Sequence, residues 1–420
     1  MNRITDHSAP LKICLLSYRS NPHSGGQGVY VANLSRALMD LGHYVHVISG
    51  PPEPNLDDDI PLSRLPGLDL YNPGDLFRTP SFKELSDPIN LIEWLGVSTM
   101  GFPEPFTFGM RAYRYLLKNN IFKYDIVHDN QCISYGIRAI FQFIPAIATI
   151  HHPITIDRAL AIKTASSFWK KIKHMRWYSF IGMQKRVIKK FSHIITVSKN
   201  AKKDIIKDFK IPQERFRIIP NGINTNLFYP VPEIRREKNR IIVTNSADTP
   251  LKGLHYLLKA LNAISKTRSV RLTVIGTPKK NGSIEALIRH LGIGRWVTFT
   301  GRIDSNEYLR QYARASVAVI PSLYEGFGLP AGEAMACGIP VISTTGGALS
   351  EVVGDAGILV PPADHVALAE AITDVLDNPE LAQKMGRAGY QRVHQFFTWK
   401  RAAEMTVEAY RETIHDYHRF

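Results

Sequence analysis

Cysteine is scarce in this sequence: 420 residues contain only Cys14, Cys132 and Cys337. The three lie far apart and show neither metal-ligand spacing nor a disulfide framework. No apolar run reaches the ~18 residues of a membrane-spanning helix, and the N-terminal stretch lacks the apolar core of a signal peptide. These absences argue against a disulfide-rich secreted protein and an integral membrane protein. They predict reduced thiols in a cytoplasmic protein.

Acidic residues are absent from one long region. The whole chain has a net charge of +15, and residues 158–203 contain 13 basic residues and no acidic one. Four apolar residues recur there at helical spacing: Ala165, Phe168, Ile172 and Met175. A basic amphipathic helix of this kind can lie on an anionic membrane surface, so peripheral attachment at the inner face of the plasma membrane is one expectation. A helix with a core-facing stripe and solvated lysines is the other. No recognition motif accompanies the charge, so no nucleic acid is expected.

Short apolar runs alternate with helical patterns along the whole chain. Twelve runs read as strands: 11–18, 44–50, 124–129, 145–151, 192–198, 216–220, 240–245, 270–276, 296–301, 316–321, 339–343 and 357–361. Nearly continuous hydrophobicity indicates strands that are covered on both faces, hence parallel sheets flanked by helices. The predicted fold class is therefore α/β. It comprises two Rossmann-like, doubly wound parallel-sheet domains that face a central cleft.

The domain boundary is expected near an Asn-Gly turn and a proline-rich, charged linker at 219–240. We predict an N-terminal domain over 1–219 that binds the acceptor and a C-terminal domain over 220–397. The helical segment 398–420 is expected to pack back on the first domain. Residues 51–105 hold 10 of the 26 prolines and show little periodicity, which indicates a long insertion that serves as a substrate-specific flap.

The stretch "PSLYEGFGLPAGEAMACGIPVIS" at 321–343 places Glu325 in a loop after a strand and Glu333 in the first turn of a helix starting near Pro330. Gly326 and Gly328 would let the backbone approach a ligand closely. The free amides at a helix start suit a phosphate. Two carboxylates beside a phosphate site are suited to binding the hydroxyl groups of a ribose and a sugar, so the pattern predicts a nucleotide sugar. The alternative is a pair of surface acids favoured by the helix dipole.

The ordered motifs resemble one family over about 350 residues. "GGQGVYVANLSRAL", "ATIHHP", "ITVSKNAKKDI", "IPNGIN", "PLKGLHYLL" and the two-glutamate stretch occur in the order typical of glycosyltransferase family 4, the group 1 retaining glycosyltransferases of GT-B fold. The resemblance implies catalytic roles for Glu325, His151 and Lys252. It implies donor-binding roles for Gly25, Gly26, Asn221, Ser246, Lys252, Arg302, Phe327, Gly328, Leu329 and Glu333. It implies no metal and no cofactor besides the nucleoside-diphosphate sugar.

One position departs from the family pattern. The family commonly has an arginine five or six residues before the diphosphate-binding lysine, whereas this chain has "TNSADTPLKG", with Ser246 and Asp248 in that region. Lys252, the helix N-terminus and Arg302 would then have to neutralise the leaving diphosphate.

Other readings of the motifs are weaker. "GGQGVY" lacks the third glycine of a dinucleotide site, and the second strand ends without the acid that would hold a ribose, which argues against a dehydrogenase. "DDD" at 57–59 reads as a solvated loop. The expected function is sugar transfer to a hydroxyl acceptor, either a lipid-linked glycan or polysaccharide precursor at the cytoplasmic membrane face. Alternatives are a small soluble acceptor and a catalytically silent nucleotide-sugar-binding protein.

Overall fold

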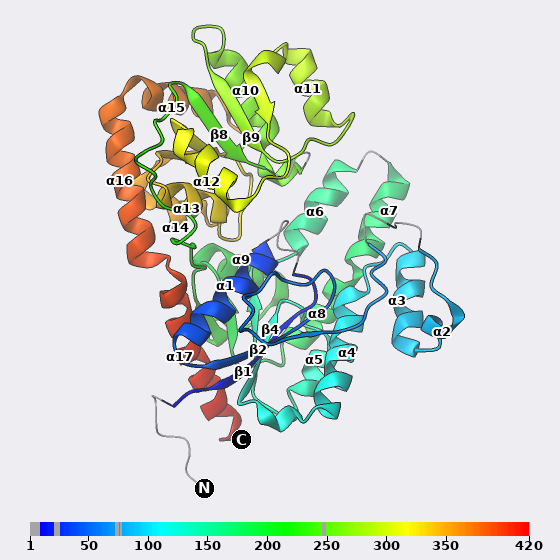
Figure 1. Cartoon of the computed structure of the whole chain (residues 1–420). Coiled ribbons are helices and arrows are strands. Elements are labelled where there is room, and N and C mark those ends of the chain that lie inside the picture. The colour runs from blue at the N-terminus through cyan, green and yellow to red at the C-terminus, as the bar shows by residue number, and fades with distance from the viewer. Residues whose placement is uncertain are drawn as a thin grey trace. The chain divides into compact units, whose positions relative to one another are not determined.

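The computed structural model describes residues 9–20, 26–71, 75, 78–165, 167–245 and 249–419 (Figure 1). The chain divides into two compact units. Unit 1 comprises Met1–Val197, Lys202–Ile219 and Ala402–Phe420, and unit 2 comprises Ser198–Ala201 and Pro220–Arg401. Each unit is built around its own parallel sheet, as the near-continuous apolar runs predicted.

The described part of unit 1 forms a seven-stranded sheet with the order β3-β2-β1-β4-β5-β6-β7, in which every pairing is parallel. The strands are β1 (Lys12–Ser17), β2 (Tyr44–Ser49), β3 (Leu62–Arg64), β4 (Ile126–Asn130), β5 (Ala146–Ile150), β6 (Ile194–Thr196) and β7 (Phe216–Ile218). The six strands predicted for this half are confirmed. Their side chains are almost entirely buried because helices cover both faces.

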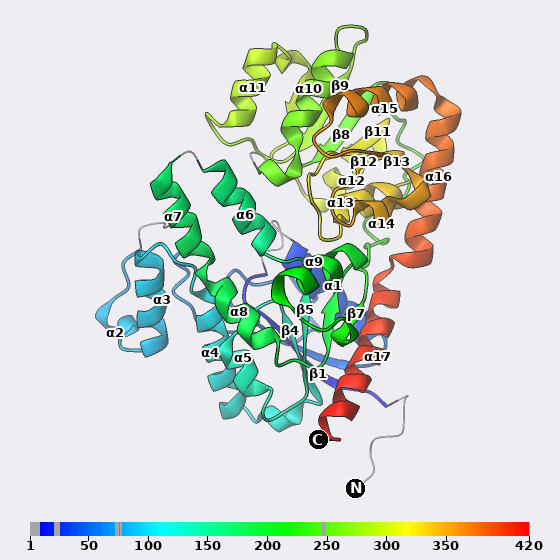
Figure 2. The ribbon, with the colours of Figure 1, turned by 180° about the vertical axis from the view of Figure 1, so that it is seen from behind.

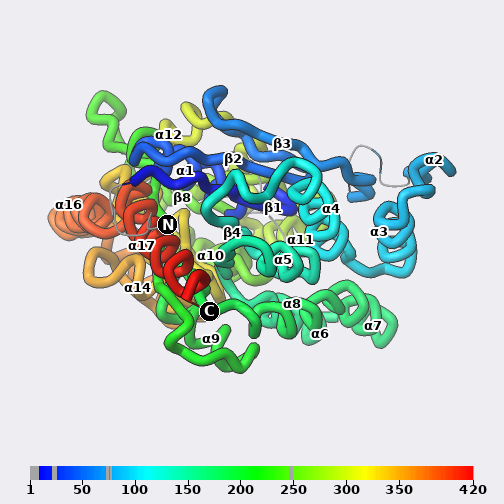
Figure 3. Tube along the Cα trace, turned by 90° about the horizontal axis from the view of Figure 1, so that it is seen from below, coloured from blue at the N-terminus to red at the C-terminus, as the bar shows by residue number. Residues whose placement is uncertain are grey.

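Helices cover both faces of the unit 1 sheet. They are α1 (Gly26–Asp40), α2 (Phe82–Leu85), α3 (Pro88–Ser98), α4 (Glu104–Lys118), α5 (Tyr135–Ile140), α6 (Thr155–Thr164), α7 (Phe168–Trp177), α8 (Ile181–Ile188), α9 (Lys199–Phe209) and α17 (Trp399–Tyr417). Figure 3 shows α1 and α17 on one side of β1, β2 and β4, with α4, α5 and α8 on the other. Reversal of the strand order at β1 places the crossover helices on opposite faces.

The end of α17 contacts the sheet of unit 1 through polar pairs. The Tyr410 hydroxyl lies 2.6 Å from His128 Nδ1. His193 Nε2 lies 2.9 Å from Asp416 Oδ2, and Arg217 forms an ion pair with Glu412. Tyr410 is fully buried, so this helix is an integral part of the core of unit 1.

The segment 51–105 is more structured than an irregular flap. It contributes β3, which pairs with β2 through Val47 and Leu62, and also α2 and α3. The buried Glu93 of α3 accepts a hydrogen bond of 3.0 Å from the amide of Leu68. The predicted strands did not include β3. A three-residue edge strand among prolines has no readable alternation, and pairing with a neighbour determines it.

The described part of unit 2 holds a six-stranded parallel sheet with the order β10-β9-β8-β11-β12-β13. The strands are β8 (Arg240–Thr244), β9 (Arg271–Ile275), β10 (Val297–Phe299), β11 (Val317–Ile320), β12 (Val341–Thr344) and β13 (Ile358–Val360). All six were predicted. The helices are α10 (Leu254–Ile264), α11 (Ser283–Leu291), α12 (Ser305–Arg314), α13 (Leu329–Ala336), α14 (Leu349–Val353), α15 (His365–Asp377) and α16 (Pro379–Phe396).

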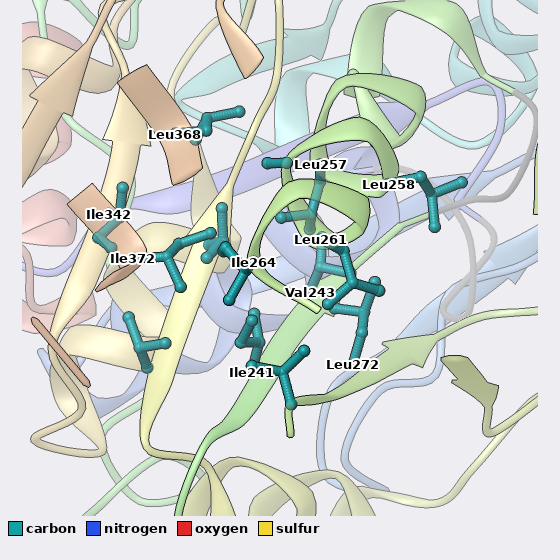
Figure 4. Close-up of a cluster of buried hydrophobic side chains, with 14 of the residues drawn as sticks. Ile241, Val243, Leu257, Leu258, Leu261, Ile264, Leu272, Ile342, Leu368 and Ile372 are labelled. Carbon is teal, nitrogen blue, oxygen red and sulfur yellow. The ribbon is translucent and has the colours of Figure 1, made fainter. Parts of the chain in front are cut away.

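The main core of unit 2 lies between the sheet and α10 with α15. Leu257, Leu258, Leu261 and Ile264 of α10 pack on Ile241 and Val243 of β8, while Leu368 and Ile372 of α15 complete the cluster (Figure 4). Alternate residues of β8 point to the opposite face, where Thr244 contacts Tyr308 and Tyr312 of α12. The strand thus separates an apolar layer from a polar layer next to its carboxyl end.

We predict that Leu261→Ala destabilises unit 2 by about 2–5 kcal/mol, because Leu261 is fully buried and its removal leaves a cavity. Urea unfolding monitored by circular dichroism measures the change. The exposed Val366 of α15 provides a control, and Val366→Ala should cost less than about 0.5 kcal/mol. Equal effects of the two substitutions would contradict the assignment of this core.

Candidate active site

The loop between β11 and α13 is held by hydrogen bonds on both sides of Glu325. The Glu325 carbonyl accepts a 2.8 Å hydrogen bond from the amide of Ala348. A Cβ on Gly347 would lie 2.2 Å from the same carbonyl oxygen, so only glycine fits there. Ser322 Oγ donates a 2.8 Å hydrogen bond to Glu325 Oε1. The carboxylate is therefore oriented by its own loop at the carboxyl end of β11.

Lys252 and Glu325 form an ion pair. Lys252 Nζ lies 2.7 Å from Glu325 Oε1, and the two side chains are 31% and 12% exposed. Lys252 ends the turn Pro250–Lys252, and Gly253 follows with a φ of 67°. A Cβ on Gly253 would lie 1.9 Å from the carbonyl oxygen of Pro321. This close backbone approach places Lys252 beside the loop that carries Glu325.

Glu333 lies in the second turn of α13. Gly328 has a φ of 101° and precedes the helix, which runs from Leu329 with Pro330 in its first turn. We predicted that Glu333 lies in the first turn of a helix that starts near Pro330. This prediction was wrong, because Gly328 caps the helix and Leu329 is already its first residue. A Cβ on Gly328 would lie 2.6 Å from Leu349 Cδ2, so this sharp entry to the helix needs glycine.

The carboxylate of Glu333 is partly buried. Burial raises its pKa to about 7, although the hydrogen bond from Tyr308 and the charge of Lys252 oppose the rise. The Tyr308 hydroxyl lies 3.3 Å from Glu333 Oε2 and 2.9 Å from Thr244 Oγ1. Glu333 therefore has an oxygen, Oε1, without a hydrogen bond among the described residues, and can accept hydrogen bonds from a ligand.

Asn221 lies on a segment that packs against α13. Ile223, two residues further along the chain, packs so closely on α13 that a Cβ on Gly332 would lie 2.4 Å from its side chain. The amide of Ile223 donates a 2.7 Å hydrogen bond to the carbonyl of Phe397. The Asn221 side chain is 6% exposed, and its Oδ1 has no partner among the described residues. A buried amide oxygen without a protein partner can accept a hydrogen bond from a bound ligand.

The remaining predicted donor-binding residues differ in their surroundings. Phe327 is buried, and its ring packs edge-on against Phe397. Within the described ranges, no group accepts a hydrogen bond from the amides of Phe327, Gly328 or Leu329, as expected before a helix. Arg302 is exposed beyond β10 and forms no described ion pair. Gly26 begins α1, whereas Gly25, Ser246 and Asp248 lie outside the described residues.

Sequence reasoning missed three polar residues at the edge of the same sheet. Ser322 orients Glu325, and Tyr308 contacts Glu333. Asn245 directly follows β8 and is 2% exposed, with neither side-chain atom paired among the described residues. Position after a strand was the only signal for Asn245 and Ser322. Tyr308 lies on α12, and no local sequence pattern indicates that its hydroxyl reaches Glu333.

In unit 1, His151 follows β5 in a hydrogen-bonded cluster. Its amide donates a 2.8 Å hydrogen bond to Gln131 Oε1, and its Nε2 lies 2.8 Å from Asn130 Oδ1. The pKa of His151 is lowered to about 3, mainly by burial and to a lesser extent by the neighbouring His152 and His128. The imidazole is therefore neutral at physiological pH.

The contacts of His151 define its tautomer. Asn130 Nδ2 donates to Ser17 Oγ at 3.2 Å, which leaves Asn130 Oδ1 as an acceptor for an Nε2–H of His151. His151 Nδ1 then carries a lone pair that can accept a hydrogen bond. These contacts favour a neutral ring that is protonated at Nε2.

Among the described residues, no group of three or more His, Cys, Asp or Glu side chains could hold a metal ion. No described helix is long and apolar enough to cross a membrane.

The architecture of two parallel-sheet units is that of a GT-B glycosyltransferase. It matches sucrose-phosphate synthase from Thermosynechococcus elongatus with a TM-score of 0.74 and 25% identity, covering 97% of this chain and all of that one. It also matches Anabaena HepE in complex with UDP and glucose, with a TM-score of 0.68, 17% identity and coverage of 95% and 98%. The second likeness concerns the fold alone.

Residues 24–227 match the model "Glycosyltransferase Family 4", and residues 229–392 match "Glycosyl transferases group 1". An MMP alpha-(1->4)-mannosyltransferase from Mycolicibacterium hassiacum is 44% identical over 96% of this chain and 98% of its own length. A glycogen synthase from Mycobacterium tuberculosis is 27% identical, over 95% and 94%. The chain belongs to glycosyltransferase family 4, the group 1 glycosyltransferases.

We predict that Glu333→Gln stabilises the ligand-free protein at pH 8 but not at pH 4.5. In the native state Glu333 has a pKa of about 7, whereas its ordinary value is 4.5. Between these pH values the unfolded chain releases the proton more readily than the native protein, so the stability of the native state falls as pH rises. Glutamine does not ionise, so the variant does not lose stability in this pH range. The loss in the wild-type protein amounts to at most about 3 kcal/mol. Urea midpoints at both pH values measure it, with Glu370→Gln on the exposed face of α15 as the control. A pH-independent difference would contradict the assignment.

Proposed function

We propose that this protein is a retaining α-mannosyltransferase that moves mannose from a nucleoside-diphosphate mannose to a hydroxyl of a glycan acceptor. The identity of 44% with an alpha-(1->4)-mannosyltransferase supports the sugar and the anomeric configuration. If the donor carries mannose in the α configuration, an α-linked product requires retention. The observation that carries the proposal is the Lys252–Glu325 pair beside the open helix start at Leu329.

In this proposal the edge of unit 2 binds the donor. Glu333 Oε1 accepts hydrogen bonds from the ribose, and the amides of Phe327, Gly328 and Leu329 contact the phosphates at the start of α13. Lys252 and these amides stabilise the charge that develops on the leaving diphosphate, with Arg302 as a further cation. Asn221 and Asn245 supply buried amide groups that lack partners. No cofactor besides the sugar nucleotide is required.

Glu325 and His151 are proposed to act on the transferred sugar. Glu325 Oε1 is occupied by Lys252 and Ser322, which leaves Oε2 to accept from a sugar hydroxyl. The neutral His151 accepts a further hydroxyl hydrogen bond at Nδ1. Negative or neutral acceptors suit a sugar that gains positive, oxocarbenium-like charge at the transition state.

The proposed chemical step conserves configuration. The bond between the anomeric carbon and the diphosphate oxygen breaks, and the electron pair leaves with the diphosphate. The acceptor oxygen attacks the anomeric carbon from the same face, and its proton passes to the departing diphosphate oxygen. His151 does not take this proton in the proposed mechanism, because its depressed pKa makes it a poor base.

We expect transfer of mannose from GDP-mannose or another nucleoside-diphosphate mannose to α-mannoside acceptors, with retained activity in EDTA. Product configuration is read by NMR. Lys252→Ala and Glu325→Gln should each lower kcat at least ~100-fold, since each removes charge stabilisation or positioning at the reacting sugar.

The control is Lys259→Ala on the exposed face of α10, which should leave kcat unchanged. Near-wild-type rates for both site variants would contradict the assigned roles. Nucleotide-dependent thermal stabilisation without turnover would favour a silent binding protein, and transfer only to free sugars would favour a small soluble acceptor.

We further propose that this transfer takes place at the inner face of the plasma membrane, on a lipid-linked glycan, with α7 on the anionic surface. The structure changes the predicted stripe: α6 ends at Thr164 and α7 starts after the capping Ser167, so Ala165 lies outside both helices. Phe168, Trp169 and Met175 are 71%, 77% and 60% exposed. Figure 2 shows α6 and α7 side by side.

One end of α7 is packed while the other is exposed. Trp177 stacks on Phe102 with a centroid distance of 5.1 Å, and Arg176 donates a 2.8 Å hydrogen bond to Thr99. The first turn presents Phe168 and Trp169 among the basic residues of 158–203. Aromatic rings favour the membrane interface, and each nearby Lys or Arg contributes about 1 kcal/mol on an anionic leaflet.

We predict that the protein co-sediments with vesicles containing phosphatidylglycerol but not with phosphatidylcholine vesicles. The double variant Phe168→Ser/Trp169→Ser should reduce bound protein at least ~fivefold because it removes the inserting rings. Phe122→Ser is a matched control, since Phe122 is also 71% exposed but lies before β4. Equal binding to both vesicle types, or equal loss in the control, would rule out α7 as the contact.

A further inference from the structure

A cavity lies at the opposite edge of the unit 2 sheet from the proposed donor site. Its volume is about 980 Å³. Asn239 and Ser316, which directly precede β8 and β11, line it together with Gly338 before β12. Lys252 and Glu325 follow the carboxyl ends of strands in the same sheet. The cavity is therefore separate from the residues assigned to sugar transfer.

Two chain segments form the walls. One is 230–239, which leads into β8, and the other is the face of α16 that carries Gln383, Arg387 and Tyr390. Close packing of α16 maintains this arrangement, because a Cβ on Gly386 would lie 2.2 Å from the carbonyl oxygen of Gly338. The apolar part of the lining consists of Pro230, Val375, Leu376, Pro379 and Ala382.

The charged part of the lining is mainly basic. Arg236, Lys238 and Arg387 face one acidic residue, Glu380. Arg236 Nη2 donates a 2.6 Å hydrogen bond to the carbonyl of Gly338. Within the described ranges none of the three cations forms an ion pair, whereas five other arginines of unit 2 do. The cavity thus combines unpaired positive charge with an apolar wall.

We propose that this cavity binds an amphipathic organic phosphate, with the phosphate on Arg236, Lys238 and Arg387 and an apolar or aromatic body against Leu376, Ala382 and Tyr390. With Glu380 the three cations leave a net charge of +2, which matches the roughly −2 charge of a phosphate monoester. Arginine can bind the phosphate through two parallel hydrogen bonds. The volume lies within the range of small-molecule sites. The proposal does not depend on sugar transfer.

Binding here would contact two segments of unit 2 that lie far apart in the sequence. Segment 230–239 leads into β8, and α16 follows α15 on the other side of the cavity. A bound ligand would brace these two segments against each other. We therefore expect ligand binding to raise the melting temperature of the protein.

Isothermal titration of the full chain with 1-naphthyl phosphate tests the proposal, with inorganic phosphate and 1-naphthol as partial ligands. The cations and the apolar wall both contribute to binding. We therefore expect 1-naphthyl phosphate to bind at least about tenfold more tightly than inorganic phosphate or 1-naphthol. Equal affinity for inorganic phosphate, or no binding of the ester up to about 5 mM, would overturn the amphipathic site.

The location is tested with Lys238→Glu/Arg387→Glu, which should weaken the ester at least about tenfold. The control is Lys259→Glu/Lys384→Glu, which changes the net charge of the protein by the same amount. Both residues are exposed and lie outside the cavity, so the affinity for 1-naphthyl phosphate should stay unchanged. If Lys252→Ala abolished binding of the ester, or if a nucleoside diphosphate competed with it, the ester would bind at the donor site instead. Either result would overturn the proposal. Circular dichroism checks folding, and the transfer assay reports separately on the proposed function.

Discussion

The close approach of the Pro250–Lys252 turn to the end of β11 is the contact on which the proposed donor site depends. Because Gly253 has no Cβ, its backbone can lie against the carbonyl of Pro321. The amide of Leu323 also donates a 2.7 Å hydrogen bond to the carbonyl of Leu251. These backbone contacts bring Lys252 to Glu325, and a side chain at position 253 would push the ion pair apart.

Buried polar groups at both sheet edges are maintained at an energetic cost. In unit 2 the pKa of Glu333 is raised, and Asn221 and Asn245 lack partners among the described residues. In unit 1 burial keeps His151 neutral. Such groups destabilise a ligand-free protein, but a ligand rich in hydroxyls and phosphates can satisfy them. This pattern is typical of a site prepared for a polar ligand.

Sequence reasoning succeeded where a pattern was local and repeated. The twelve predicted strands are present because each is a buried apolar run bounded by turn residues. It failed at β3, where three residues acquire strand structure only by pairing with β2. It also joined Ala165 to the stripe of α7, although Ser167 caps that helix and separates the two. Helix ends depend on single capping contacts that periodicity does not reveal.

The sequence by itself determined the α/β class, the family, and the types of residue available for chemistry. Only the tertiary structure decided which of them meet. The pairing of Lys252 with Glu325 spans 73 positions and that of Tyr308 with Glu333 spans 25. The cavity between segment 230–239 and α16 joins stretches about 150 residues apart. Contacts over such separations arise from how sheets and helices pack, and packing depends on the whole chain rather than on any local pattern.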